Sequence, residues 1–311
     1  MKILVTGGAG FIGSNLTDKL IESGHNVIIV DNLSTGKREN INPHALFYEM
    51  DLNDKDLPSI FKENKPEYVF HLAAQADVRK SVSDPLGDAS TNIMGMLNLL
   101  KESKNNNVKK FIFSSSGGVI YGETPKPATE DNPPNPISPY GVAKLAGEGY
   151  VKSFSRWEGL NYTILRYANV YGPRQDPKGE AGVVSIFIGQ IEQGIKSYLY
   201  GAGKLERDYV FVEDVARANI LCLENGANST FNIGTGIATS VEGLHTMIEQ
   251  ASAKHNKKEL APKRAGELER NVLNIERAQK QLGWKPDVAL KDGLKKTYEW
   301  FITEIKHENG N

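Results

Sequence analysis

The sequence has little of what secreted, membrane-spanning or nucleic-acid-binding proteins require. Its 311 residues include a single cysteine, Cys222, so an intramolecular disulfide is excluded and a reducing compartment is favoured. No apolar run approaches the roughly 18 residues that a membrane-spanning helix needs. The net charge of −1 provides no general attraction to nucleic acid or to anionic membranes. The N-terminus has no signal-peptide pattern, and we therefore expect a cytoplasmic protein.

The segment 1–31 is the most informative part of the chain. A short apolar run, a glycine cluster, a helical pattern and a second apolar run that ends at Asp31 predict a strand, a turn, a helix and a strand. Gly7, Gly10 and Gly13 would let the backbone approach a pyrophosphate, and the helix N-terminus would offer it unpaired N–H groups. A βαβ unit that binds no nucleotide is the weaker interpretation. Asp31 favours NAD over NADP, because its carboxylate would accept from a ribose hydroxyl and repel a 2′-phosphate.

The chain alternates short apolar runs with amphipathic helical stretches as far as about residue 168. This alternation predicts an α/β fold with a Rossmann-like, doubly wound parallel sheet. Beyond Pro173 the elements become short, with polar and glycine-rich stretches between them. We therefore predict a dinucleotide-binding domain at 1–168, with a later contribution near 209–232, and a smaller C-terminal α/β substrate domain at 169–208 and 233–311.

Further cofactor contacts are predicted where the strands end. The polar segment after Asp31 is suited to an adenosine ribose, and Asp51 could receive the adenine amino group or simply cap the next helix. Small residues after the fourth strand leave room for a cofactor, and Asn92 could bond a neighbouring strand end. His71 lies within a strand and is interpreted as a core residue.

Tyr140 and Lys144 are four residues apart and share one face of a predicted helix. A phenol is a poor base at neutral pH because it titrates near about 10. A lysine ammonium one turn away, together with a positive nicotinamide ring, would lower the pKa of Tyr140. A serine at the end of the fifth strand could then hold a substrate oxygen. The combination predicts an acid–base pair with an assisting hydroxyl.

These motifs together resemble the short-chain dehydrogenase/reductase superfamily, and the segment from Thr6 to Gly13 resembles its extended branch of NAD-dependent epimerases and dehydratases. The resemblance covers nearly the whole chain and is greatest for UDP-glucose (or UDP-N-acetylglucosamine) 4-epimerases. It implies Ser116, Tyr140 and Lys144 as catalytic residues. Together with the contacts argued from the strand ends, the resemblance implies a cofactor-binding set of Gly7, Gly10, Phe11, Ile12, Asp31, Asn32, Ser34, Thr35, Gly36, Asp51, Leu52, Leu72, Ala73, Ala74, Gln75, Asn92, Tyr140, Lys144, Tyr167 and Val170. Because the stretch after Ser116 is one residue longer than usual, Ser115 stays open as the catalytic serine.

The resemblance also implies a nucleotide-sugar site. The segment around Asn169 would contact the sugar nucleotide, Arg207 and Arg264 the diphosphate, and Glu267 a uridine ribose hydroxyl. Guanidinium groups suit diphosphate oxygens, although either arginine alone would be read as a surface charge. Asn271 falls where 4-epimerases place a gate beside the sugar, and a residue smaller than tyrosine there would leave room for a 2-acetamido group. The implied substrate-binding residues are Ser116, Tyr140, Asn169, Val184, Arg207, Arg264, Glu267 and Asn271.

The implied function is NAD-dependent C4 epimerisation of a UDP-hexose through a 4-keto intermediate. The substrates would be UDP-N-acetylglucosamine and UDP-N-acetylgalactosamine, UDP-glucose and UDP-galactose, or both pairs. UDP-glucuronate 4-epimerase stays open. A 4,6-dehydratase is disfavoured because Gly117 and Gly118 stand where dehydratases carry an Asp-Glu pair, and a non-catalytic dinucleotide-binding protein would usually lack Tyr140 or Lys144. A homodimer through helices near 84–104 and 138–156 is implied, with no metal, nucleic-acid or membrane partner.

Overall fold

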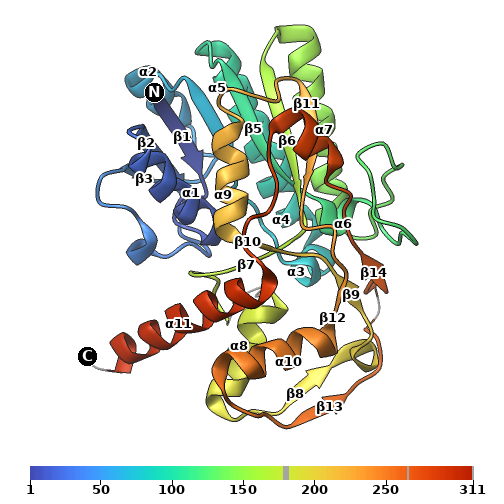
Figure 1. The fold of residues 1–311 in the computed structure, drawn as a ribbon. Helices are drawn as coiled ribbons and strands as arrows, with labels where there is room; N and C mark the ends of the chain where they lie inside the picture. The colour runs from blue at the N-terminus through green and yellow to red at the C-terminus, as the bar shows by residue number, and fades with distance from the viewer. Residues whose placement is uncertain (178–181, 265, 310–311) are drawn as a thin grey trace.

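The computed structural model describes residues 1–177, 182–264 and 266–309. Its centre is a seven-stranded sheet in which every strand pairs in parallel with its neighbours (Figure 1). The strand order is β3-β2-β1-β4-β5-β6-β11, so the chain builds outward from β1 in both directions. This confirms the doubly wound α/β prediction. The strands are β1 (Lys2–Thr6), β2 (Asn26–Asp31), β3 (Leu46–Glu49), β4 (Tyr68–His71), β5 (Lys110–Ser116), β6 (Asn161–Tyr167) and β11 (Ser229–Ile233).

Helices cover both faces of this sheet, which explains why its strands read as continuous apolar runs. Alternate residues of β1 enter different cores: Ile3 and Val5 pack on one face and Leu4 on the other. Figure 1 shows α1 and α9 side by side in front of the sheet. The helices of the large unit are α1 (Phe11–Glu22), η1 (Arg38–Asn40), α2 (Leu57–Asn64), α6 (Gly117–Ile120), α7 (Pro139–Glu158) and α9 (Val212–Leu221).

The connection from β4 to β5 is helical but not one regular helix. The sequence pattern predicts a helix from about Asp84 to Lys104, and the structure interrupts that span with a π-helical turn. Asp77 and Asp84 accept backbone N–H groups of Lys80 and Gly87 and thereby start two short helices. Such π turns are frequent at functional sites. The pieces are α3 (Val78–Ser83), α4 (Pro85–Ala89), η2 (Ser90–Met94) and α5 (Gly95–Asn105).

A smaller unit follows β6 and has its own apolar core, formed mainly by α8, α10 and α11. Its strands are short and belong to three small sheets, β10-β7, β12-β9-β14 and β13-β8. The elements are β7 (Asn169–Tyr171), α8 (Val183–Gln193), β8 (Ser197–Leu199), η3 (Tyr200–Gly203), β9 (Glu206–Arg207), β10 (Tyr209–Phe211), β12 (Thr239–Ser240), α10 (Val241–Ser252), β13 (Lys258–Leu260), β14 (Arg270–Asn271) and α11 (Leu290–Asn309).

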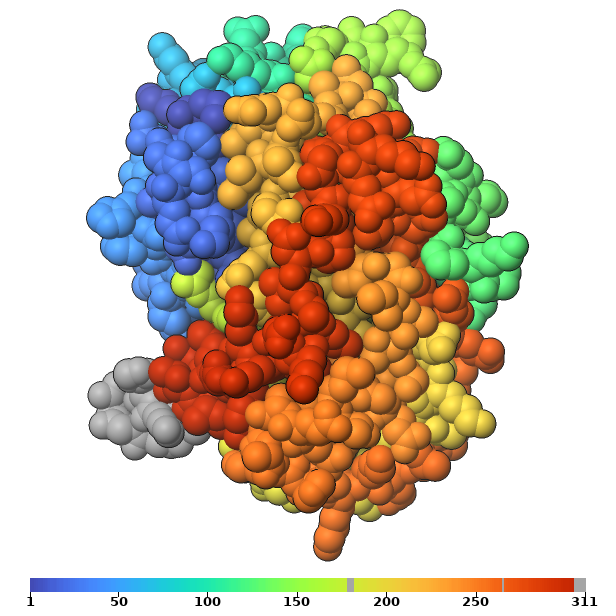
Figure 2. Space-filling view, in the orientation of Figure 1, coloured from blue at the N-terminus to red at the C-terminus, as the bar shows by residue number. Residues whose placement is uncertain are grey.

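The segment 272–284 returns from the small unit to the large one. Leu273, Ile275 and Trp284 are buried in the same core as β1 and α1, and this segment includes η4 (Ala278–Leu282). Figure 2 shows the orange-to-red end of the chain lying across the front of both units. The predicted domain boundaries stay a prediction. The packing of segment 272–284 adds that this part of the predicted substrate domain lies in the core of the large unit. Among the helices described here, none is long and apolar enough to cross a membrane.

Candidate active site

The sheet reverses its strand order between β1 and β4, and a crevice for ligands is expected at the carboxyl ends of strands at such a point. The two strand ends meet closely there. The amide of Leu72 donates to the carbonyl of Thr6 at 3.1 Å, and the Ala73 amide donates to the Thr6 hydroxyl at 3.3 Å. A Cβ on Gly7 would lie 2.6 Å from the Ala73 nitrogen, and Gly7 has a φ of +73°. Only glycine fits at this point of the turn.

The glycine turn leads directly into α1. Gly10 occupies the N-cap position, and no side chain among the described residues caps the helix, so the first-turn N–H groups are left for a ligand or water. A Cβ on Gly13 would lie 2.0 Å from the Gly7 carbonyl oxygen, so the helix can approach the turn only because this residue is glycine. Phe11 and Ile12 are partly exposed at this helix start. The arrangement forms a cradle of backbone donors suited to a pyrophosphate.

Asp31 lies at the end of β2, beside this cradle, and is 8% exposed. Its carboxylate accepts the amides of Ala9 and Leu33, both at 2.9 Å. The next residue, Asn32, donates to Asp51 at 2.8 Å and thereby joins the ends of β2 and β3. The segment then folds back, with the Lys37 amide on the Ala9 carbonyl. Residues Asn32, Ser34, Thr35 and Gly36 are exposed or partly exposed along this path.

The loop after β4 is fixed by Asn92 from the π turn. The Asn92 side chain accepts the Gln75 amide and donates to the Gln75 carbonyl, both at 2.9 Å. The sequence predicted a bond from Asn92 to the backbone of a strand end; the structure places this bond in the loop, four residues beyond the end of β4. Asn92 also donates to Asp88, which accepts the Gln75 side chain as well. Asp88 is 2% exposed, and burial raises its pKa.

The tip of β5 places three consecutive serines in different environments. Ser115 is buried and donates to Glu148 at 2.7 Å, whereas Ser114 shares a hydrogen bond with the Tyr167 hydroxyl at 3.0 Å. Ser116 is partly exposed at the strand end and precedes α6. Because side chains alternate along a strand, Ser115 points to the face opposite Ser116. This geometry favours Ser116 as the serine that meets a substrate.

Tyr140 and Lys144 lie in the first two turns of α7, which begins with a Ser138 side-chain cap on the Gly141 amide. The Lys144 ammonium is 5.8 Å from the centre of the Tyr140 ring, so the predicted shared face is present. Lys144 is 5% exposed and donates to the carbonyl of Ser114 at 2.9 Å. Burial lowers the pKa of Lys144 to about 8, and the Asp88 carboxylate opposes that shift.

His71 has no part in this arrangement as a free base. It is 1% exposed, shares a hydrogen bond with the Thr6 hydroxyl at 2.8 Å and stacks on Phe113. Burial, with a smaller contribution from the Lys144 charge, lowers the pKa of His71 to about 3. The interpretation of His71 as a core residue is confirmed. His71 and Lys144 contact the same aromatic ring, because the Lys144 ammonium lies 5.1 Å from the centre of Phe113.

The residues predicted to bind the diphosphate lie in the small unit, and their side chains are less constrained than those at the tip of β5. Arg264 is exposed and its guanidinium lies 3.5 Å from the centre of the Tyr200 ring. Glu267 accepts the Arg264 amide at 2.9 Å, which joins the two predicted residues; residue 265 lies outside the described part of the chain. Arg207 is partly buried on β9 and donates to the Glu206 carbonyl, and burial lowers its pKa. A cavity of about 640 Å³ is bordered by Gly201, Lys204, Leu260 and Lys263 beside this region.

Asn271 lies where β14 approaches the β5 tip. It is 1% exposed, and its amide nitrogen donates to the Gly117 carbonyl at 3.1 Å. Its side-chain oxygen is buried and has no hydrogen-bond partner among the described residues. Gly117 has no space for a side chain, because a Cβ there would lie 2.7 Å from a methyl carbon of Leu273. A side chain at position 117 would therefore require Leu273 to move.

A model of the NAD-dependent epimerase/dehydratase family matches residues 3–234. The chain belongs to this family. It is 44% identical over 308 residues to the UDP-glucose 4-epimerase of Mycolicibacterium smegmatis, covering 97% of this chain and 98% of that one. A crystal structure of Thermotoga maritima UDP-glucose 4-epimerase with UDP-glucose has a TM-score of 0.96 and 52% identity, covering 98% of this chain and 100% of that one. The UDP-N-acetylglucosamine 4-epimerase of Methanobrevibacter ruminantium, solved with UDP-N-acetylmuramic acid, has a TM-score of 0.92 and 39% identity, covering 97% and 98%.

As a member of this family, the protein has NAD as its dinucleotide, in agreement with the prediction from Asp31. Within the family, the chain is similar to UDP-sugar 4-epimerases, which supports an enzyme of the isomerase class. Several predicted contacts lie deep in the structure. Leu52 is 8% exposed, Tyr167 4% and Val184 1%, and Tyr167 also bonds Asn219. The remaining predicted residues, Leu72, Ala73, Ala74, Gln75, Asn169 and Val170, are partly exposed, and their roles stay predictions.

Three residues around the site escaped the sequence interpretation. Glu148 follows Lys144 by four residues, and this helical spacing could have indicated that both belong to one buried stripe. Asp88 is buried beside the loop after β4, and Tyr200 stacks under Arg264. No motif marks Asp88 or Tyr200, because their importance comes from contacts between segments far apart in the chain.

Proposed function

We propose that the protein catalyses reversible C4 epimerisation of a UDP-hexose with NAD retained as its cofactor. The observation that carries this proposal is the buried Lys144 beside Tyr140 at the tip of β5, next to the NAD crevice. The two arginines of the small unit, Arg207 and Arg264, supply cations on the other side. This combination suits oxidation and reduction of a hydroxyl on a sugar that is anchored by a diphosphate.

The residues of the crevice fit NAD. Gly7, Gly10 and Gly13 carry no Cβ that would keep a pyrophosphate away from the backbone donors, and Asp31 lies where a ribose hydroxyl could donate to it. Gln75 and its neighbours after β4 would border the nicotinamide end. When bound, NAD supplies a hydride acceptor for the sugar carbon and returns the hydride in the reverse step.

Proton transfer would be the task of Tyr140. As a phenolate it takes the proton of the 4-hydroxyl, and it returns that proton when the opposite face of C4 is reduced. The Lys144 ammonium favours the phenolate through its charge, and its bond to the Ser114 carbonyl keeps it at that place. Ser116 would donate to the same sugar oxygen and hold it near Tyr140.

Substrate anchoring would come from the small unit. Arg207 and Arg264 would pair with the diphosphate, and Glu267 would accept from a ribose hydroxyl. An epimerase has to hold the nucleotide firmly while the sugar turns over to present its other face. Arg264 stacks on the Tyr200 ring at 3.5 Å, and stacking through the face of the guanidinium leaves its edge N–H groups available for a phosphate group.

Substrate choice would depend on Asn271. Its nitrogen is committed to Gly117, so its unpartnered oxygen can accept a hydrogen bond from the sugar or from a 2-acetamido N–H group. Leaving such an acceptor unpaired costs about 1–3 kcal/mol, which a substrate donor would recover. We therefore propose that UDP-N-acetylglucosamine and UDP-N-acetylgalactosamine are substrates in addition to UDP-glucose and UDP-galactose.

The test is incubation of the purified protein with UDP-glucose, UDP-N-acetylglucosamine and UDP-glucuronate, each followed by NMR of the anomeric protons. We expect epimerisation of both the plain and the acetamido sugar. Turnover of UDP-glucose alone would refute the acetamido proposal, and turnover of none of the three would refute the epimerase proposal. Asn271→Ala should lower turnover of the acetamido sugar more than that of UDP-glucose.

A homodimer is proposed from an apolar surface near the predicted helices. Val82, Leu86, Met94 and Val142 lie on α3, α4, η2 and α7, and Leu86 is 83% exposed. Clustered apolar side chains of this kind mark interaction sites. Light scattering should report a dimer that Leu86→Asp dissociates, whereas Leu260→Asp, at an exposed position of the small unit, leaves it intact. A monomeric wild-type protein would contradict the proposal.

A further inference from the structure

Glu148 and Arg166 form a buried ion pair that neither the sequence motifs nor the proposed chemistry uses. Glu148 is 1% exposed and Arg166 4%. The two side chains pair through two bonds: Arg166 Nε donates to Glu148 Oε1 at 2.8 Å, and Nη2 donates to Oε2 at 2.6 Å. Burial disfavours the charged guanidinium, but the bonds to Glu148 and its charge more than offset this and raise the pKa of Arg166. Arg166 therefore carries its charge at the point where it meets Glu148.

This pair connects the helix of the proposed acid–base residues to the strands beneath it. Tyr140, Lys144 and Glu148 follow one another at four-residue intervals on α7, so Glu148 lies about 6 Å further along the helix than Lys144. Arg166 is on β6, and Ser115 on β5 donates to the same Glu148 oxygen at 2.7 Å. The strand register pairs Ser115 with Arg166, so Glu148 is fixed to two adjacent strands at once.

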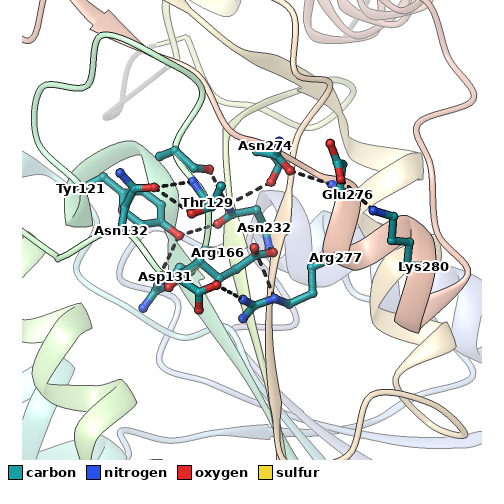
Figure 3. Close-up of polar contacts among 12 residues, drawn as sticks. Tyr121, Thr129, Asp131, Asn132, Arg166, Asn232, Asn274, Glu276, Arg277 and Lys280 are labelled. Carbon is teal, nitrogen blue, oxygen red and sulfur yellow. Dashed lines mark hydrogen bonds and ion pairs between the residues drawn. The ribbon is translucent and has the colours of Figure 1, made fainter.

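The far side of Arg166 is fixed as firmly (Figure 3). Its Nη1 donates to the Tyr121 hydroxyl at 2.7 Å, and its guanidinium lies over the Tyr121 ring. Tyr121 in turn donates to Asn232 on β11 at 2.7 Å. Burial, despite the Arg166 charge, raises the pKa of Tyr121 to about 12, so the hydroxyl remains a donor. These contacts hold Arg166 in the orientation in which its Nε and Nη2 atoms donate to Glu148.

The three consecutive serines at the tip of β5 have different environments, and two of them bond to α7. The Ser114 carbonyl accepts from Lys144, the Ser115 hydroxyl donates to Glu148, and Ser116, the proposed substrate contact, is partly exposed. Two successive turns of α7 are therefore fixed to consecutive residues of one strand. A displacement of the helix along or around its axis would move Tyr140 and Lys144 together relative to Ser116.

We propose that Glu148 and Arg166 are positioning residues that hold α7 so that Tyr140 and Lys144 meet the substrate hydroxyl beside Ser116. This inference rests on the proposed function of Tyr140 and Lys144. Stability alone is a poor reason for such a pair, because buried ion pairs replaced by apolar residues often leave proteins as stable or more stable. Precise placement of reacting groups, by contrast, is worth up to about 100-fold in rate for roughly 1 Å.

The first experiment compares Glu148→Gln with wild type and with Lys152→Met. Lys152 lies one turn further on α7, half-exposed, with its ammonium 3.7 Å from Glu148, but it does not connect the helix to the sheet. We expect Glu148→Gln to lower kcat for UDP-glucose by about 10- to 100-fold, with KM and bound NAD within about threefold of wild type. Lys152→Met should match wild type.

The second experiment separates positioning from stability. In the double variant Glu148→Met with Arg166→Met both charges are removed, so no buried charge is left unpaired. We expect a melting temperature close to that of wild type and a kcat reduced as in Glu148→Gln. A double variant with wild-type kcat, or a kcat loss explained entirely by loss of folded, NAD-containing protein, would overturn the proposal.

A readout independent of turnover is the titration of Lys144, followed by NMR of its ¹³Cε resonance. The groups that face this ammonium are Tyr140 on α7, Asp88 on α4 and the neutral His71 on β4. In wild type the titration should fall near pH 8; in Glu148→Gln, a loosened helix admits water and the midpoint should move upward. An unchanged midpoint would contradict the proposal even if the wild-type protein proved to have no epimerase activity, so the two failures are distinguishable.

Discussion

The two sides of the candidate site are built differently. In the large unit, Lys144 is 5% exposed and bonded to a strand carbonyl, and the loop after β4 is fixed by Asn92. In the small unit, Arg264 is exposed and stacks on the ring of Tyr200. Within the described part of the chain, the hydrogen bond found for the Arg207 side chain goes to the carbonyl of its neighbour Glu206. The groups proposed to transfer protons are held in place by the protein. The groups proposed to bind the nucleotide have fewer fixed contacts before it binds.

This difference follows from what each side has to do. A proton donor or acceptor is effective only if it is already oriented when the substrate arrives, since reorientation would add to the barrier. A binding arginine loses less from mobility, because its charge attracts a diphosphate over a distance before the final contacts form. We therefore expect substitutions in the large unit to change kcat and those in the small unit to change KM.

Tyr140→Phe should have the largest effect. Removing the phenolic oxygen eliminates the proposed acid–base group, and positioned proton transfer is worth about 10²- to 10⁴-fold. We expect kcat to fall by that factor while KM and bound NAD change little, measured by UDP-glucose turnover and by the NAD content of the purified protein.

Tyr150→Phe is the matched control, because Tyr150 is 39% exposed on the same helix. It should retain wild-type kcat. If Tyr140→Phe retained wild-type turnover, the assignment of Tyr140 would be refuted and the contrast between the two units would lose its main support.

Arg264→Ala should mainly raise KM. A charged hydrogen bond contributes about 1.5–3 kcal/mol, which corresponds to roughly 10- to 100-fold in KM with little change in kcat. The measurement is a full saturation curve with UDP-glucose. Lys254→Ala, which removes a surface ion pair with Glu192 in the same unit, is the control. A large fall in kcat with unchanged KM would show that Arg264 belongs to the chemical side.

The sequence predicted the large unit better than the small one, and the reason is physical. The apolar runs of β1, β2 and β5 are buried on both faces, and the glycines of the first turn have a local steric cause, so both leave marks in the sequence. The π turn at Ser90–Met94 leaves none, because it depends on Asn92 reaching Gln75 in another segment.

The candidate site was predicted in part for the same reason. Tyr140 and Lys144 are recognisable because a helix places residues four apart together. The pairing of Glu148 with Arg166, the burial of Asn271 against Gly117 and the return of segment 272–284 to the large core depend on tertiary contacts. The arginines of the small unit were assigned by family resemblance, since their local sequence alone indicates ordinary surface charges.

The pH dependence of kcat tests how firmly the large unit controls Lys144. A lysine is charged below its pKa and neutral above it. With the pKa of Lys144 lowered to about 8, the ammonium loses its charge in a pH range where kcat can be measured. We expect kcat to fall roughly fivefold between pH 8 and pH 9, as one group with this pKa titrates. Lys144→Arg, whose guanidinium stays charged, should lack this alkaline fall even if it is slower. A wild-type kcat that stays level or rises through this range would contradict the role of the ammonium.

The smallest expected effect compares two buried histidines, one in each unit. His71 in the large unit is hydrogen-bonded to Thr6. Neither ring nitrogen of His245 in the small unit has a hydrogen-bond partner among the described residues, although its Nδ1 lies 3.6 Å from the Glu249 carboxylate. Burying unpaired polar atoms costs about 1–3 kcal/mol, so His245→Leu should raise the free energy of unfolding by about 1 kcal/mol. His71→Leu leaves Thr6 without this partner and should lower it by a similar amount. Urea unfolding followed by circular dichroism measures the free energy of unfolding of both variants. The kcat of His245→Leu should equal that of wild type. Shifts of the same sign in the two variants would show that the two units do not differ in how they satisfy their buried polar groups.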